Sequence, residues 1–189
     1  MGPQLNFGDQ LTAVDMRNGS SHTPIVKSLL WPDEMASQGF ASALAQQPNL
    51  RRAFVELHGD LGAGKTTLVR HILRALGVQG RVKSPTYAVV EPYELPDLNV
   101  WHFDFYRFSD PREWEDAGFR DIFASPGLKL AEWPEKAAGF IPLADLVIQV
   151  NVLEDESRQV TLTAATPIGQ ALLNAVSPEL LAPNTQDPA

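Results

Sequence analysis

In the first half of the chain, the spacing of apolar residues alternates between the period of a helix and the period of a strand. Residues 33–47 predict a helix whose apolar side chains roughly share one face, with Asp33 available as its N-terminal cap. Residues 53–58 (AFVELH) predict a strand. Residues 65–76 predict a second helix, because they carry a clear apolar stripe, and Gly77 provides the usual left-handed stop.

The second half of the chain alternates in the same way. Residues 86–93 and 99–105 are both β-like, and the link between them is too short for a parallel crossover, so an antiparallel hairpin is expected. Asp110 begins a short helix that Gly118 could end. Three further strands are predicted at residues 128–133, 146–152 and 159–164. This order predicts an α/β fold, a mixed β-sheet with helices on both faces.

The two ends of the chain lack this periodicity. Residues 1–27 are rich in Gly, Ser, Asn and Asp, which predicts a flexible N-terminal extension. Residues 167–189 predict a loose C-terminal tail, in which residues 171–176 could form one or two helical turns. The folded domain is therefore expected to span residues 28–166, consistent with one domain in a chain of 189 residues.

Composition narrows the class of protein. The chain has 15 Lys and Arg against 23 Asp and Glu, a net charge of −8, which disfavours a protein that grips nucleic acid along its backbone but leaves room for a local basic patch. The absence of cysteine excludes disulfides, thiolate metal sites and a cysteine nucleophile. No apolar run approaches the roughly 18 residues of a membrane span, and no signal-peptide pattern is visible. A cytoplasmic protein without membrane contact is therefore expected.

A glycine-rich segment between the first predicted strand and the second predicted helix carries the clearest chemistry. Residues 59–66 (GDLGAGKT) fit the phosphate-loop pattern G-x-x-x-x-G-K-[ST] in the strand-to-helix setting that it requires. Gly62 and Gly64 allow the backbone N–H groups to converge on phosphate oxygens. Lys65 places a cation against the terminal phosphates, and the hydroxyl of Thr66 is placed to ligate Mg²⁺.

A nucleotide–Mg²⁺ site also needs carboxylates from neighbouring strands, and Asp104 is the first candidate. The alternation in VWHFDFYR puts His102, Asp104 and Tyr106 on one strand face. A functional role is favoured for Asp104, because a lone carboxylate between aromatic residues is an unusual surface choice. For His102, a role in the site and a place on a solvated strand face are equally open.

Glu132 is the second candidate carboxylate. It closes the run LKLAE, and an apolar strand that ends in an acid is the general form of a Walker B element. Lys129 interrupts the run and weakens the match, so the residues alone leave open whether Glu132 binds a metal. Trp133 beside it could cover the site or belong to the core, and the core is favoured.

Two further features between the second helix and the hairpin have alternative interpretations. Residues 84–86 (SPT) could sense a γ-phosphate or form a simple proline turn. Four basic residues could form a solvated helix face, which is the commoner case, or a docking patch for an acidic partner or RNA. These residues are Arg70, Arg74, Arg81 and Lys83.

The phosphate loop does not specify the reaction. The guanine-reading motif N-K-x-D and an ABC signature are both absent from the sequence. Only Arg158 lies beyond Arg120, which argues against the arginine-rich lid of a small-molecule kinase. By elimination, the sequence fits best an ATPase that uses ATP to change the state of a partner protein. A nucleotide-gated interaction module with incidental hydrolysis, or a small-molecule kinase, remains the alternative.

Four motifs taken together resemble one family. GDLGAGKTTLVR, VKSPTY, HFDFYR and AEWPE, in this order and spacing, are similar to the TsaE family of phosphate-loop NTPases. The resemblance implies a weak, Mg²⁺-dependent ATPase that supports a TsaB–TsaD heterodimer in threonylcarbamoyl modification of the tRNA adenosine next to the anticodon. It also implies that this chain meets tRNA only indirectly, through that complex.

The resemblance carries roles onto particular residues. It implies that Thr66 and Glu132 bind Mg²⁺, that residues 84–86 form a switch-like loop, and that residues 31–33 contact the adenine. The implied catalytic residues are Lys65, Asp104 and Glu132. The residues expected to bind ATP are Asp33, Gly59, Asp60, Gly62, Ala63, Gly64, Lys65, Thr66 and Thr67.

Overall fold

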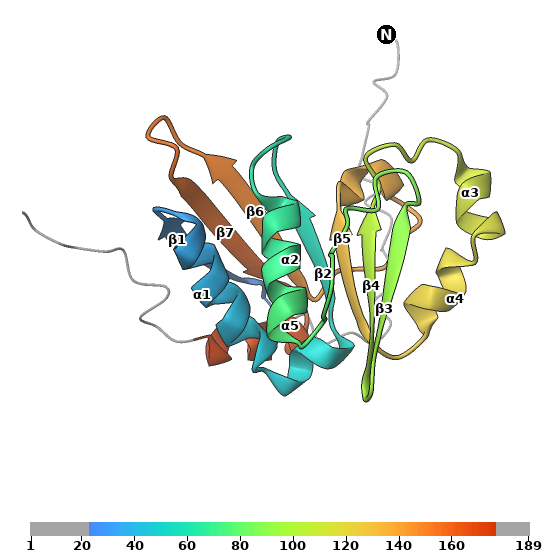
Figure 1. The fold of residues 1–189 in the computed structure, drawn as a ribbon, viewed down its shortest axis with the longest axis horizontal. Coiled ribbons are helices and arrows are strands. Elements are labelled where there is room, and N and C mark those ends of the chain that lie inside the picture. The colour runs from blue at the N-terminus through green and yellow to red at the C-terminus, as the bar shows by residue number, and fades with distance from the viewer. Residues whose placement is uncertain (1–22, 177–189) are drawn as a thin grey trace, which may run out of the picture.

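The computed structural model describes residues 23–176, which build a seven-stranded mixed sheet of order β1-β7-β6-β2-β5-β4-β3 (Figure 1). The strands are β1 (Ile25–Trp31), β2 (Phe54–His58), β3 (Val90–Leu95), β4 (Leu98–Asp104), β5 (Leu128–Glu132), β6 (Leu146–Val152) and β7 (Arg158–Ala164). The helices are α1 (Glu34–Ala45), α2 (Lys65–Ala75), α3 (Pro111–Asp116), α4 (Phe119–Ala124) and α5 (Pro167–Ala175), with 3₁₀ turns η1 (Pro48–Arg52) and η2 (Pro134–Ala137).

The four central strands, β6, β2, β5 and β4, run parallel, and the remaining strands pair antiparallel at the two edges. Parallel strands are covered on both faces, and all five residues of β5 are accordingly buried, including its charged ones. Their carboxyl ends meet at one edge of the sheet, the usual place for ligands in such folds. β2, β4 and β5 end there at His58, Asp104 and Glu132.

Two hydrophobic clusters cover the two faces of the sheet. The larger one joins α1, α2 and α5 to the sheet, with Phe40, Leu68 and Leu172 among its buried side chains. The smaller one is aromatic and joins α3 and α4 to β4, with Phe103 and Trp114 at its centre. In Figure 1, α1 and α2 lie side by side, and α3 and α4 lie beyond the β3–β4 hairpin. The predicted α/β fold with helices on both faces is confirmed.

Local signals explain most elements. Asp33 caps α1, since its Oδ1 accepts a hydrogen bond of 3.0 Å from the N–H of Ala36. The apolar stripe of α2 is buried, and Gly77 follows the helix with a φ of 100°. The β3–β4 hairpin is antiparallel, as expected, but β3 begins at Val90 rather than at residue 86. Residues 86–88 form a turn instead, closed by the Val89 N–H to the carbonyl of Pro85.

The structure corrects the expected domain boundaries at both ends. β1 begins at Ile25, inside the expected extension 1–27, because it pairs along its whole length with β7. α5 occupies residues 167–175 of the expected tail 167–189, and its Leu172 and Leu173 are buried in the main cluster. The rest of the expected extension and tail lies outside the described residues. Among the described helices, none combines the length and apolar character needed to cross a membrane.

Candidate functional site

The phosphate loop connects β2 to α2, and its glycines have a steric basis. Gly59 has a φ of 139°, and a Cβ there would lie 2.4 Å from the carbonyl oxygen of Val150. Gly64 has a φ of 109° and is the left-handed N-cap of α2. It supplies no side chain to bond the first N–H groups of the helix, so these donors remain available for an anion.

Lys65 is the first residue of α2 and is 4 % exposed. Its Nζ donates hydrogen bonds to the carbonyl oxygens of Gly59 (2.5 Å) and Asp60 (2.8 Å) and lies 4.0 Å from the ring centroid of Trp133. Burial lowers the pKa of Lys65, and the negative charges of Glu132 and its neighbours oppose that effect. The ammonium is therefore held inside the loop, where an incoming phosphate would exchange with carbonyl oxygens.

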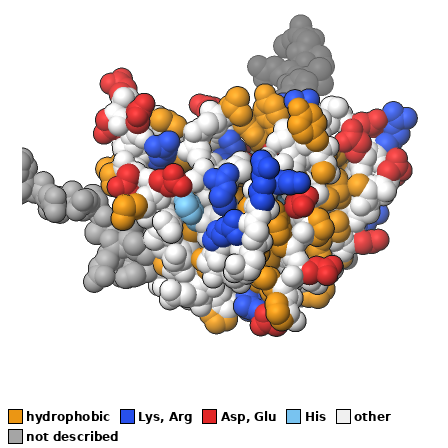
Figure 2. Space-filling model, in the orientation of Figure 1, with side chains coloured by type: hydrophobic (Ala, Val, Ile, Leu, Met, Phe, Trp, Pro, Cys, Tyr) orange, Lys and Arg blue, Asp and Glu red, His pale blue; other side chains and the backbone are white. Residues whose placement is uncertain are grey.

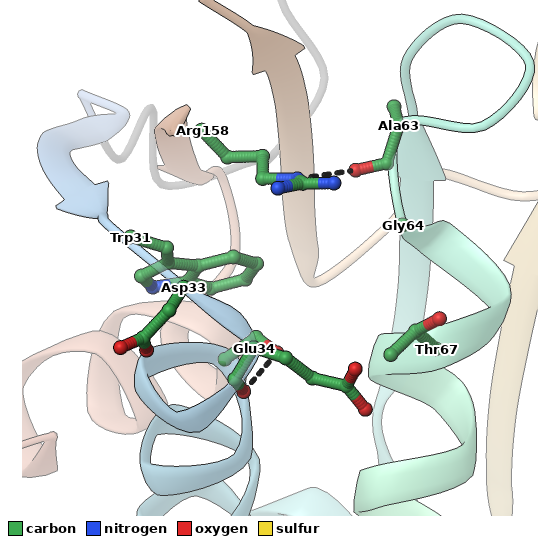
Figure 3. Close-up of a pocket in the computed structure, with 8 residues that line it drawn as sticks. Trp31, Asp33, Glu34, Ala63, Gly64, Thr67 and Arg158 are labelled. Carbon is green, nitrogen blue, oxygen red and sulfur yellow. Dashed lines mark hydrogen bonds between the residues drawn. The ribbon is translucent and has the colours of Figure 1, made fainter. Parts of the chain in front are cut away.

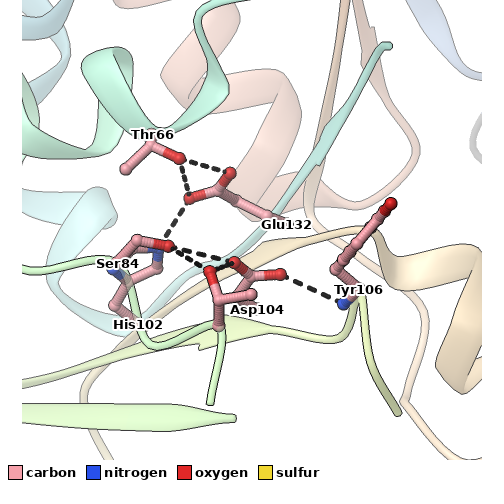
Figure 4. A network of polar contacts seen from close by, with 7 residues as sticks. Thr66, Ser84, His102, Asp104, Tyr106 and Glu132 are labelled. Carbon is pink, nitrogen blue, oxygen red and sulfur yellow. Dashed lines mark hydrogen bonds and ion pairs between the residues drawn. The ribbon is translucent and has the colours of Figure 1, made fainter. Parts of the chain in front are cut away.

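Glu132 joins the phosphate loop to β4. Its Oε1 and Oε2 accept from the hydroxyl of Thr66 at 2.9 and 2.8 Å, and its Oε1 lies 2.8 Å from His102 Nε2 (Figure 4). Glu132 is 2 % exposed and His102 is completely buried. A hydroxyl and a carboxylate that converge in this way are the hard oxygen donors that Mg²⁺ prefers, so the residues fit a Mg²⁺ site completed by phosphate oxygens.

Asp104 anchors the segment between α2 and the hairpin. Its Oδ2 accepts from the hydroxyls of Ser84 (3.0 Å) and Thr86 (2.9 Å), and its Oδ1 accepts from the backbone N–H of Tyr106 at 3.0 Å (Figure 4). Asp104 is the register partner of Glu132 on the adjacent parallel strand. Each oxygen of the two carboxylates thus takes part in at least one hydrogen bond, and the two groups lie side by side at the carboxyl edge of the sheet.

A pocket of about 350 Å³ contains these groups. It is lined by the loop and the start of α2, by both carboxylates, and by the SPT segment. The lining residues are Leu61, Gly62, Gly64, Lys65, Thr66, Thr67, Ser84, Thr86, Asp104, Tyr106, Glu132 and Trp133. We call this space the phosphate pocket.

A second pocket, of about 170 Å³, lies on the other side of the loop (Figure 3). Its lining comes from β1, α1, the loop and β7, and consists of Trp31, Asp33, Glu34, Ser37, Ala63, Gly64, Thr67 and Arg158. Trp31 packs against Phe40, with ring centroids 5.4 Å apart, and Arg158 Nε lies 3.5 Å from the carbonyl oxygen of Ala63. We call this space the base pocket, and it shares Gly64 and Thr67 with the phosphate pocket.

The structure brings most of the predicted site residues into these two pockets. Lys65, Thr66, Asp104 and Glu132 line the phosphate pocket. Gly62 lines it as well, and Ala63 lines the base pocket. Gly64 and Thr67 line both pockets.

Three predicted binding residues are placed differently from the rest. Asp33 lies in the base pocket, away from the phosphate pocket, and its carboxylate caps α1. Gly59 and Asp60 line neither pocket and contact Lys65 through their carbonyl oxygens.

Sequence reasoning missed Arg158 as a site residue and left His102 undecided. Arg158 begins β7, which lies between β1 and β6 in the sheet and is far along the chain from the loop, and no local motif marks it. The signal for His102 was its place two residues before Asp104 on the same strand face, which the structure buries rather than exposes to water. Trp133 is half-buried and covers Lys65.

Lys129, which interrupts the Walker B-like run, is accommodated by the backbone. Its Nζ donates to the carbonyl oxygens of Ser125 and Gly127 and lies 5.0 Å from the ring of Trp101. Burial lowers its pKa. The lysine therefore turns back toward the start of β5 and leaves the Glu132 end of the strand free. Among the described residues, no three His, Cys, Asp or Glu side chains converge to hold a metal by themselves.

Comparisons with known proteins agree with this geometry. The family model "Threonylcarbamoyl adenosine biosynthesis protein TsaE" matches residues 31–160. The chain belongs to the TsaE family. The matched range includes the phosphate loop, both carboxylates and Arg158.

Curated relatives support the same assignment, and a solved structure shares the fold. The chain is 41 % identical to the TsaE protein of Haemophilus influenzae over 150 residues, covering 77 % of this chain and 94 % of that one. It is 33 % identical to the Bacillus subtilis TsaE protein over 143 residues, covering 74 % and 87 %. The crystal structure of B. subtilis YdiB has the same fold, with a TM-score of 0.67 at 24 % identity over 84 % of this chain and 99 % of that one.

Proposed function

We propose that this chain is a weak, Mg²⁺-dependent ATPase that supports a TsaB–TsaD heterodimer in threonylcarbamoyl modification of the tRNA adenosine next to the anticodon. The observation that carries the proposal is the pair of pockets that meet at the phosphate loop and share Gly64 and Thr67. One pocket offers the edge of the Trp31 ring, the Arg158 guanidinium and polar groups that could meet a base and ribose, and the other offers a lysine, a hydroxyl and two carboxylates. A nucleoside triphosphate has the same two halves, joined at the same point.

Binding begins with the backbone of the loop. The N–H groups at the start of α2 and the positive end of that helix attract the phosphates. Lys65 exchanges its bonds to Gly59 and Asp60 for phosphate oxygens, and in this dry setting its charge attracts the terminal phosphates strongly. The base enters beside Trp31 and Arg158, which line the base pocket from two different strands.

Thr66 and Glu132 would hold Mg²⁺, and when bound the ion neutralises charge on the phosphate oxygens as they react. His102 orients Glu132 through the 2.8 Å contact between Nε2 and Oε1. Lys65 stabilises the negative charge that develops on the transferred phosphoryl group. Asp104 holds Ser84 and Thr86 at the rim of the phosphate pocket, and so determines how that rim faces the terminal phosphate.

A second candidate function, a nucleotide-gated interaction module, draws on the same hydrogen bonds. Ser84 and Thr86 are tied to a carboxylate inside the phosphate pocket, so a ligand that engages Asp104 alters the loop that carries them. In that case ATP creates a docking face, and hydrolysis is incidental. The two functions differ in whether repeated turnover of the modifying enzyme consumes ATP.

Reconstitution with purified TsaB–TsaD tests the proposal. We expect complex formation that depends on ATP, stimulation of ATP hydrolysis by the heterodimer, and multiple rounds of tRNA modification only with hydrolysable nucleotide. If a non-hydrolysable ATP analogue supports full modification over many rounds, the interaction module replaces the ATPase. If phosphate from ATP appears on an acceptor other than water, the chain is a kinase and the proposal fails.

A further inference from the structure

A cationic hollow lies next to the phosphate pocket. It has a volume of about 550 Å³ and shares Ser84 with that pocket. Its cations come from two segments, the outer face of α2 and the loop that leads to the hairpin, and they are Arg70, Arg74, Arg81 and Lys83. Figure 2 shows Lys and Arg side chains gathered near the centre of this face, in front of α2, while most Asp and Glu side chains lie toward its margins.

The four cations of the hollow have no carboxylate partner in the part of the chain that the structure describes. Arg74 is fixed in place, because its guanidinium donates to the carbonyl oxygens of Val78 (2.9 Å) and Gly80. Four like charges around one hollow repel one another, and an anion bound between them relieves that repulsion.

The surface continues from the hollow to an exposed aromatic residue. After Ser84 the chain reaches Tyr87, which is 84 % exposed, and the guanidinium of Arg107 lies 4.6 Å from its ring centroid. An exposed aromatic ring with a cation beside it offers an unpaired base a face for stacking. Two cations of the hollow, Arg81 and Lys83, and the exposed ring of Tyr87 therefore belong to one short segment, residues 81–87.

We propose that this surface, the cationic hollow together with Tyr87 and Arg107, binds the backbone of a single-stranded or looped RNA directly, in contrast to the expectation from the family resemblance that the chain meets tRNA only through a complex. Three of the four hollow cations are arginines, whose planar guanidinium groups match phosphate oxygens in a two-pronged way. The only apolar residue of the lining, Val82, is 8 % exposed, so the hollow lacks the apolar centre of a typical protein–protein interface. The choice of RNA over an acidic protein rests partly on the proposed function, which places tRNA in the same reaction.

The net charge of −8 does not oppose this binding. Charges beyond the Debye length of about 8 Å at physiological ionic strength are largely screened, so a ligand in the hollow responds mainly to the nearby cations. Because Ser84 belongs to both the hollow and the phosphate pocket, RNA on this surface and nucleotide in the pocket contact the same loop.

Fluorescence anisotropy with a fluorescein-labelled RNA hairpin tests the proposal on the full chain. We expect a Kd of about 10⁻⁴–10⁻⁶ M that weakens as salt is raised. The double variant Arg70→Glu/Arg81→Glu should weaken binding at least about 10-fold and reduce the salt dependence. The control Arg51→Glu/Arg112→Glu changes the net charge by the same amount but alters residues outside the hollow, and should bind far more tightly than the first variant. Tyr87→Ala should weaken binding to a looped RNA more than to a fully paired one.

The outcomes separate this inference from the proposed function. ATP binding and basal hydrolysis, measured on the same samples, should be retained by Arg70→Glu/Arg81→Glu, which also shows that the variant is folded. Equal RNA affinity in the two double variants would overturn the inference and leave the ATPase proposal intact. Loss of TsaB–TsaD binding in the hollow variant, with RNA affinity unchanged, would assign the surface to an acidic protein and overturn it too. RNA binding that disappears in Lys65→Ala would place the RNA in the phosphate pocket, a third contradiction.

Discussion

The two pockets on either side of the phosphate loop are built in different ways. In the phosphate pocket, the carboxylates of Asp104 and Glu132 are held by hydrogen bonds from four side chains and one backbone N–H before any ligand arrives. The base pocket is lined by side chains from distant elements of the chain, which bond mainly to backbone groups, as Asp33 does to Ala36 and Arg158 to Ala63. The first is a rigid polar network and the second is a surface assembled from separate side chains.

This difference predicts different responses to mutation. A network of buried polar groups fails sharply when one member is removed, because the remaining partners stay buried without hydrogen bonds. A pocket lined by separate side chains loses affinity gradually, since each side chain contributes a modest share of the contact area. Five measurements can test whether the two pockets behave in this way.

Replacement of Lys65 by alanine should have the largest effect. Hydrogen bonds to charged groups contribute roughly 1.5–3 kcal/mol each, so we expect ATP affinity to fall by about 100-fold or more. Isothermal titration calorimetry measures this directly. The control Lys136→Ala removes an exposed lysine from η2 and should bind ATP like the wild type. Wild-type affinity in Lys65→Ala would show that the ammonium does not contact the phosphates.

Glu132→Gln should separate binding from hydrolysis. The amide keeps the shape of the side chain but loses the charge, so ATP binding without Mg²⁺ should persist. The Mg²⁺-dependent rate should fall by roughly 100-fold, as expected when a metal-binding group is lost. Glu115→Gln, which alters an exposed residue of α3, serves as the matched control. Normal hydrolysis in Glu132→Gln would remove Glu132 from the metal site.

His102 tests whether the network acts by positioning Glu132. His102→Ala should raise the Mg²⁺ concentration needed for half-maximal ATP binding by about 10-fold, because Glu132 loses its orienting partner. His102→Gln can restore a donor near the position of Nε2 and should recover most of that loss. If both variants shift the Mg²⁺ dependence equally, His102 serves packing alone, and thermal unfolding would then report the same loss in both.

Arg158→Ala should have a smaller effect, confined to the base. A cation beside an aromatic ring contributes about 0.5–1 kcal/mol at an exposed site, so ATP affinity should fall by roughly 2–5-fold. Inorganic triphosphate, which has no base, should bind Arg158→Ala and the wild type equally. Competition between ATP and triphosphate measures both values in one titration. Equal losses for both ligands would place Arg158 at the phosphates and contradict the assignment of the base pocket.

The pH dependence of ATP binding should be the mildest effect. Burial lowers the pKa of Lys65 below its ordinary value of 10.5, and bound phosphate restores a negative charge that favours the protonated form. ATP affinity should therefore be constant at neutral pH and fall as the pH rises through the lowered pKa, with proton uptake on binding. Calorimetry in buffers with different heats of ionisation detects this uptake. An affinity independent of alkaline pH would argue against a charged Lys65 in the complex.

The two pockets also differ in how far the sequence could predict them. The phosphate loop, the acid that ends β5 and the acid that ends β4 are local patterns, and their strands are parallel neighbours, so their convergence followed from the order of elements. The base pocket depends on β1 pairing with β7, a contact between the two ends of the described chain. No local pattern in residues 25–31 predicts that they pair with β7. For this reason the sequence predicted neither β1 nor a role for Arg158 in the pocket.

Tertiary packing explains the other differences. α4 is too short to show a helical period, and it forms because Phe119 fits into the aromatic cluster of β4 and α3. α5 contains Gly169, which weakens its helical pattern, and it forms because Leu172 and Leu173 complete the main core. Lys129 interrupts a buried strand, and the carbonyl oxygens of Ser125 and Gly127 just before that strand make the lysine compatible with burial.

A crystal structure with Mg²⁺ and a non-hydrolysable ATP analogue tests the central claim most directly. The account predicts the base between Trp31 and Arg158, the phosphates on the N–H groups at the start of α2, and Lys65 turned from its carbonyl partners to a phosphate oxygen. Thr66 and Glu132 should face the ion. A base bound anywhere else, with the pocket beside Trp31 empty, would contradict the account even if the phosphates lay on the loop.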